Sequence, residues 1–111
     1  MKIDFRLPLD SLTSDELTFL STQVRFATRF HDAPLAGVRI ELVPDAASCR
    51  ARVTAIEQGG ATVVAERDAS TTFEAVCEAT WVLDRALHGA SMARRDSAQH
   101  NDSAQRHDWA A

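Results

Sequence analysis

The feature that most constrains the fold of this chain is a change of hydrophobic period close to its N-terminus. Between Lys2 and Leu7, apolar and charged residues alternate strictly, so that the apolar side chains share one face. This alternation predicts a half-buried strand. Pro8 ends it, and from Thr13 onward the apolar residues recur with helical spacing. The chain therefore begins with a strand and then a helix, and both have an apolar face to bury.

The first helix has a complete N-terminal signal. Thr13 is followed three residues later by Glu16, which is the spacing of a capping box, and Leu12 and Leu17 occupy the positions of a hydrophobic staple. Two adjoining apolar stripes follow, one formed by Leu17, Leu20, Val24 and Ala27 and the other by Phe19, Phe26 and Phe30. We predict a helix that has one broad apolar face and ends near Phe30.

Three more strands and a second helix follow a loop over Asp32–Gly37. We predict strands over Val38–Leu42, Cys49–Glu57 and Ala61–Arg67, with a hairpin turn at Gln58–Gly60 and a helix from Thr71 to a stop at Gly89. The mixed parity of the apolar residues in Cys49–Glu57 suggests a bulge in that strand. Small residues at 75, 79 and 86 of the second helix would form a groove that receives the phenylalanines of the first.

The element order β-α-β-β-β-α predicts an α+β two-layer sandwich. A right-handed crossover makes the first two strands parallel, and the last two form a hairpin, so the sheet is four-stranded and mixed. Both helices should cover the same face. We expect one domain over residues 1–89, and a polar, disordered C-terminal tail over residues 90–111, where the periodicity is lost.

Composition and motifs exclude several classes of protein. The chain is 45% hydrophobic and 25% charged, which is typical of a globular core. No apolar run approaches the ~20 residues of a membrane span, and the N-terminus has no signal-peptide core. We therefore expect a cytoplasmic protein that does not interact with a membrane.

The sequence offers no recognisable catalytic or metal-binding motif. Cys49 and Cys77 lack partners at metal-ligand spacing, and we expect them to be buried or half-buried thiols. The four histidines, His31, His88, His100 and His107, have no ligand spacing either, and we expect them on the surface or in the tail. These spacings predict no metal site. Because nothing pairs a nucleophile with a base, we also predict no enzyme and no small-molecule substrate.

Charge placement leaves two readings open. The net charge of −4 does not mark the whole chain as a nucleic-acid binder. Arg25 and Arg29, one helical turn apart, can bind phosphates or simply form a solvated helix face. On the open sheet face, where the cations are Lys2, Arg6, Arg39, Arg50 and Arg52, we expect cross-strand pairing with the interleaved carboxylates. Trp81, at the edge of the buried helix face, would either cover a sheet edge or contact a protein.

The order of several motifs carries a family resemblance. Gly59-Gly60 precedes a short strand, a capped turn and Phe73-Glu74-Ala75-Val76, which leads into Leu83-Asp84-Arg85-Ala86-Leu87. Together with Val38-Arg39-Ile40-Glu41-Leu42, this arrangement resembles the ribosome hibernation promoting factor family, also called ribosome-associated inhibitor A or sigma modulation proteins. The resemblance covers residues 1–88.

This resemblance implies a bacterial, cytoplasmic, ribosome-associated protein of the stress response, without cofactor or catalytic residue. It would dock on the small ribosomal subunit, bind its rRNA through cations on the two helices, inhibit translation and promote ribosome hibernation. Arg25 falls on or beside a basic position of the family's first helix, and Arg85 matches the arginine at the end of the second. The expected rRNA-binding set is Arg25, Arg29, Arg85, Arg94 and Arg95. Val82, preceded by Trp81, stands where the family places lysine.

The alternative is a divergent family member that lacks rRNA affinity and acts as a protein–protein interaction module. It would use Trp81 and its neighbours to bind another protein or a second copy of itself, so a homodimer is left open. Arginines gathered on one surface would favour rRNA binding, and arginines each matched by a carboxylate would favour the interaction module.

Overall fold

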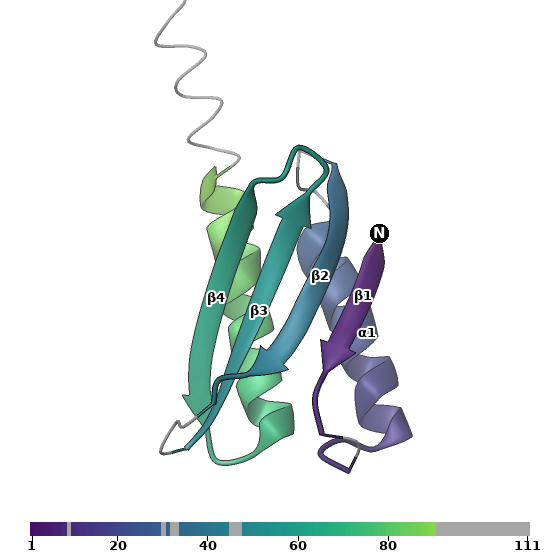
Figure 1. Ribbon diagram of the computed structural model, residues 1–111, viewed down its shortest axis with the longest axis vertical. Coiled ribbons are helices and arrows are strands. Elements are labelled where there is room, and N and C mark those ends of the chain that lie inside the picture. Colours follow the sequence, from purple (N-terminus) through teal and green to yellow (C-terminus); the bar gives the residue numbers. More distant parts are fainter. Residues whose placement is uncertain (9, 30, 32–33, 45–47, 91–111) are drawn as a thin grey trace, which may run out of the picture.

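Four strands form one sheet, and two helices cover one of its faces (Figure 1). The computed structural model describes residues 1–8, 10–29, 31, 34–44 and 48–90. The strands are β1 (Lys2–Arg6), β2 (Leu35–Leu42), β3 (Cys49–Glu57) and β4 (Thr62–Ala69), and they lie side by side in that order. β1 and β2 are parallel, and the other neighbours are antiparallel. The predicted α+β fold, with its mixed sheet and both helices on one side, is confirmed.

Both helices begin at the caps that the sequence predicts. In α1 (Ser14–Thr28) the Thr13 hydroxyl accepts from the Glu16 amide at 3.1 Å, and the Glu16 carboxylate accepts from the Thr13 amide at 2.9 Å. The second helix covers residues 72–90, and its first turn is capped by Thr71, whose hydroxyl accepts from the Glu74 amide at 3.2 Å. Each such cap contributes about 1 kcal/mol.

The helix ends differ slightly from the prediction. The last residue of α1 is Thr28 and its C-cap is Arg29, while Phe30 lies outside the described residues. The predicted stop at Gly89 is wrong, because Gly89 and residue 90 are still helical. A glycine commonly ends a helix by adopting a positive φ, and Gly89 does not adopt one. Among the described residues, the glycine with positive φ is Gly60, at 97° in the hairpin turn after β3.

The register between β2 and β3 also corrects the predicted bulge. Leu35 pairs with Glu57 and Gly37 with Ile56, so Ala36 is the extra residue and the irregularity lies in β2 rather than in β3. Immediately beyond it, Gly37 pairs with Lys2 of β1. A Cβ at position 37 would lie 2.7 Å from the Lys2 carbonyl oxygen, so this glycine permits the close approach of β1.

The core lies between the sheet and the helices. It is formed by residues of one parity in each strand and one stripe in each helix, among them Leu20, Val24, Val38, Ile40, Val53, Val76, Leu83 and Leu87. Ala51, Val53 and Ala55 of β3 face this core, which settles the parity of that strand. The opposite face of the sheet carries no helix and is open (Figure 1).

Candidate functional site

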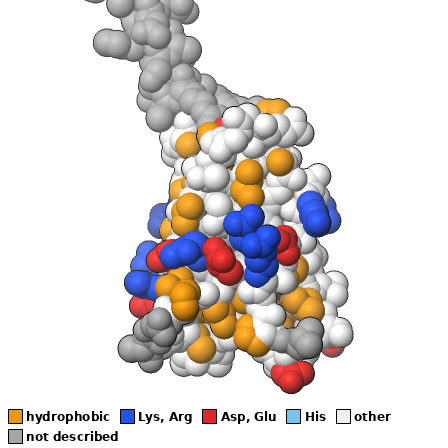
Figure 2. Space-filling model, viewed as in Figure 1, with side chains coloured by type: hydrophobic (Ala, Val, Ile, Leu, Met, Phe, Trp, Pro, Cys, Tyr) orange, Lys and Arg blue, Asp and Glu red, His pale blue; other side chains and the backbone are white. Residues whose placement is uncertain are grey.

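The open face of the sheet carries arginines that are paired with carboxylates. Arg50 lies 2.9 Å from Asp68, and Arg52 lies 2.6 Å from Glu66 and 3.8 Å from Glu41. The hydrogen bond and the charge of Glu66 raise the pKa of Arg52. Figure 2 shows the resulting row of alternating positive and negative side chains across the strands. The predicted cross-strand pairing is therefore confirmed for β2, β3 and β4.

The first two strands contribute less regular pairs to this face. Arg6 binds Asp4 of its own strand at 2.8 Å rather than a partner across the sheet. Arg39 is half-buried, and its Nε atom has no hydrogen-bond partner among the described residues. The charges of the open face nearly cancel, and this face therefore offers little net attraction to a polyanion.

The outer face of the two helices, which we call the helix layer, has a different character. Arg85 is exposed there, and Arg25 is exposed on the flank of α1 next to Met1, Pro34 and Leu35. No carboxylate of the described residues lies within ion-pair distance of either arginine. Both helices run in the same direction (Figure 1), so Arg25, Arg29 and Arg85 all lie toward the C-terminal end of the layer. Arg94 and Arg95 lie outside the described residues.

Two of these arginines pack on exposed aromatic rings. The Arg29 guanidinium lies 3.3 Å from the centroid of Phe26 and also donates to the Phe26 carbonyl oxygen. The Arg85 guanidinium lies 4.4 Å from the centroid of the Trp81 ring, and Trp81 is 58% exposed. Such stacking holds the guanidinium plane in place while its N–H edge stays available to an anion. The sequence placed Trp81 at the edge of the buried helix face, and this is wrong, because Trp81 lies on the exposed stripe of the helix together with Arg85.

The predicted packing of phenylalanines into the alanine groove is wrong. Ala75 and Ala79 are fully buried, yet Phe19 and Phe26 are 48% and 55% exposed. The stripe of α1 that faces the sheet contains Leu20, and the phenylalanines lie to one side of it. Phe19 meets Phe73 of the second helix, with 5.7 Å between the ring centroids. The helix layer therefore exposes aromatic surface that the sequence placed in the core.

The N-terminal end of the helix layer is acidic. Asp15 and Glu16 occupy the first turn of α1, and Glu74 and Glu78 lie in the first half of the second helix. The layer is thus acidic at one end, basic at the other and aromatic between. The sequence did not predict this separation of acidic and basic residues, because the separation depends on the parallel direction of the helices.

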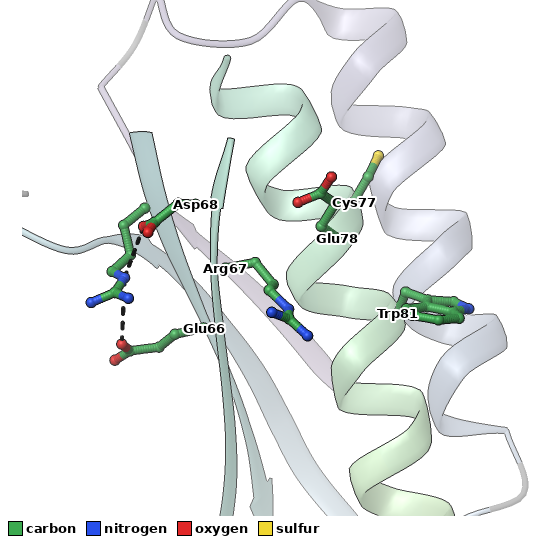
Figure 3. A pocket seen from close by; sticks show the side chains of 7 residues that line it. Glu66, Arg67, Asp68, Cys77, Glu78 and Trp81 are labelled. Carbon is green, nitrogen blue, oxygen red and sulfur yellow. Dashed lines mark ion pairs between the residues drawn. The ribbon is translucent and has the colours of Figure 1, made fainter. Parts of the chain in front are cut away.

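A pocket of about 680 Å³ opens between β4 and the second helix (Figure 3). Arg67 projects from β4 toward the helix that carries Cys77, Glu78 and Trp81 (Figure 3). Burial, assisted by Glu16 and other nearby carboxylates, raises the pKa of the Cys77 thiol. The thiol is accordingly protonated at neutral pH and is a weak nucleophile there.

Other potential sites have structural explanations. The sequence placed His31 on the surface, and this is wrong. Its side chain is 1% exposed, and its Nε2 atom lies 3.1 Å from the Glu57 carboxylate. The described residues contain no group of three His, Cys, Asp or Glu side chains that could hold a metal ion. They also contain no helix long and apolar enough to cross a membrane.

Comparison with known proteins identifies the fold. No family model matches this chain, and no curated protein does. A solved structure that does match is the N-terminal domain of Protein Y from Thermus thermophilus, at 20% sequence identity and a TM-score of 0.57. The match covers 78% of this chain and 91% of that domain. The chain therefore shares the fold of the Protein Y N-terminal domain.

Proposed function

We propose that this protein is a ribosome-associated factor that docks on the small ribosomal subunit and inhibits translation. It would bind rRNA through Arg25, Arg29 and Arg85 of the helix layer, with Arg94 and Arg95 completing the set. In the cell this role corresponds to cytoplasmic ribosome hibernation under stress. The motifs that resemble the hibernation factor family support it, and so does the fold.

The observation that carries the proposal is the contrast between the two faces. On the open sheet face, Arg50 and Arg52 are paired with carboxylates at 2.9 and 2.6 Å. On the helix layer, Arg25 and Arg85 have no such partner among the described residues. A cation without an internal partner can bind a phosphate with no ion pair to break first.

Binding of this kind involves no catalysed reaction and depends on the position and charge of the arginines. Each phosphate that a cation neutralises contributes about 0.7–0.9 to the slope of log affinity against log salt. The three helix-layer arginines alone give a slope of about −2 to −3, and the full set of five gives about −3.5 to −4.5. This is a gentle dependence, so complexes should survive moderate salt but respond strongly to the loss of any one arginine.

The test is co-sedimentation of the full chain with small ribosomal subunits over a salt series. The double variant Arg25→Gln/Arg85→Gln should lose about 1.5 units of slope and most of its binding at low salt. A double variant on the other face, Arg6→Gln/Arg50→Gln, has the same net charge and should sediment like the wild type.

An equal loss of ribosome binding in the two double variants would show that only net charge matters, and would refute docking through the helix layer. If the folded wild type stays in the supernatant at low salt, the ribosome-associated role itself is wrong. The protein–protein interaction module then takes its place, a reading that the exposed rings of Phe19, Phe26 and Trp81 favour.

A further inference from the structure

We infer that the helix layer is also a contact between two copies of this chain, packed face to face with their helices antiparallel. The inference goes beyond rRNA binding and does not rest on it. It follows from the spacing of acidic, aromatic and basic residues along the exposed side of each helix, which is nearly symmetric about a point within two residues of the middle of the helix.

The symmetry in α1 involves four residues. Asp15, an exposed residue of the first turn, lies four residues before Phe19, and Arg29 lies three residues after Phe26. When two such helices cross antiparallel about their midpoint, Phe19 of one copy faces Phe26 of the other. The exposed carboxylate of Asp15 then lies close to the partner's Arg29. Apolar contacts therefore meet apolar contacts, and charges meet opposite charges.

The second helix has the same symmetry in its outer pair of charges, whereas its central pair combines a carboxylate with an aromatic ring. Glu74 lies four residues before Glu78, and Arg85 lies four residues after Trp81. Antiparallel crossing places Glu74 opposite the partner's Arg85, and Trp81 opposite the partner's Glu78. Both helices begin at the same end of the sheet (Figure 1), so the two midpoints lie at about the same height and one two-fold axis can serve both.

Charge order alone would not carry this inference, since helix dipoles favour acidic residues at the N-terminus and basic residues at the C-terminus. The further observation is the exposure of Phe19, Phe26 and Trp81, which are 48%, 55% and 58% exposed. These rings lie between the charged ends, where a second copy would cover them. Exposed aromatic residues beside arginine are the residue types that dominate protein interfaces.

The sheet edges are less suitable for self-association. β4 is an edge strand, and Arg67 shares the parity of the buried Ala65, so its charge points to the helix side of the strand. A charge in this position disfavours the addition of another strand. β1, the other edge, has only five residues and carries Lys2, Asp4 and Arg6.

The interface is small, and the dimer should be correspondingly weak. A helix of 15 residues, such as α1, is about 22 Å long. Two such helices side by side give an area at the lower limit of specific interfaces. We therefore expect a dimer that exchanges with monomer and weakens as salt is added.

Sedimentation equilibrium of the full chain without RNA tests the inference when it is applied to variants in which one charge of a pair is reversed. Arg85→Glu places a carboxylate opposite the partner's Glu74, and Glu74→Arg places an arginine opposite the partner's Arg85. Each variant alone should raise the dissociation constant of the dimer by about tenfold or more. In an equimolar mixture of the two, every reversed charge faces its opposite, so a heterodimer should form with near wild-type affinity.

Circular dichroism verifies that both variants are folded. A wild-type chain that remains monomeric at low salt and high concentration overturns the inference. So does a dimer that neither variant weakens, because another surface must then hold it. Monomeric variants that do not recombine would overturn the antiparallel arrangement. None of these results bears on ribosome co-sedimentation, so failure here is separate from failure of the proposed function.

Discussion

Gly37→Ala should weaken the attachment of β1 to the rest of the sheet. The added Cβ would lie 2.7 Å from the carbonyl oxygen of Lys2, well inside the roughly 3.5 Å of a favourable contact. The oxygen belongs to the backbone, so the contact can be relieved only if β1 itself moves. β1 is an edge strand that pairs with β2 alone, so this movement stretches its only ladder of hydrogen bonds.

We expect a loss of about 1–3 kcal/mol, the usual range for a side chain forced into a packed site. For a domain of this size, each kcal/mol corresponds to a shift of about 4–8 °C in Tm, so the melting temperature should fall by roughly 4–24 °C. Urea unfolding measures the free energy, and hydrogen exchange should show faster exchange of the β1 amides in particular.

Gly59→Ala is the matched control. A Cβ at Gly59 meets no atom within 4 Å, and its φ is not in the positive region. This variant should be neutral or stabilised by up to about 1 kcal/mol, because alanine restricts the unfolded chain. If both glycine variants unfold at the same urea concentration, the close approach of β1 at Gly37 has no energetic importance.

Two further results are expected. Thr71→Ala should lower the free energy of unfolding, measured in urea, by about 0.5–2 kcal/mol, because the Glu74 amide loses its acceptor. Thr22→Ala, on an exposed helix face, should lower it little. Equal losses in the two variants would show that the Thr71 cap does not stabilise the fold. The raised pKa of Cys77 should make its alkylation at about pH 8 slower in the folded chain than in denaturant, with the difference narrowing as pH rises. Peptide mass spectrometry measures the rate at this site, and equal rates would contradict the burial of the thiol.

The elements that follow from short-range patterns were predictable from the sequence. The spacing of Thr13 and Glu16, and that of Thr71 and Glu74, fixes where the helices begin, because a cap depends on residues three apart. The alternation in β1 and β2, with the turn at Gly60, similarly predicts the order of strands. A right-handed crossover then leaves few ways to arrange them.

The misplaced features depend on contacts between elements that are distant in sequence. The bulge is in β2 because β1 approaches at Gly37, and nothing in Cys49–Glu57 reveals that approach. The exposure of Phe19 and Phe26 depends on how α1 is rotated on the sheet. Hydrophobic spacing alone cannot distinguish a core stripe from the exposed stripe beside it, when both are apolar.

The rRNA-binding role of Arg25, Arg29 and Arg85 stays a prediction. Their position toward the C-terminal end of the helices follows from the sequence, but the sequence alone could not show that Arg29 and Arg85 stack on aromatic rings. Whether an arginine is paired depends on strand register. Arg52, for example, meets Glu66 only because β3 and β4 align those two residues.

The parallel direction of the two helices affects how the molecule turns as it approaches a charged body. With Glu74 and Glu78 at one end of the layer and Arg25 and Arg85 at the other, the protein has an electric dipole along its helices. Its net charge of −4 repels it from a polyanion as a whole, while the same field exerts a torque that turns the arginine end forward. Salt screens both effects beyond about 8 Å at physiological ionic strength. The torque therefore acts only in the last stage of an encounter, where it selects the orientation of collisions without increasing their number.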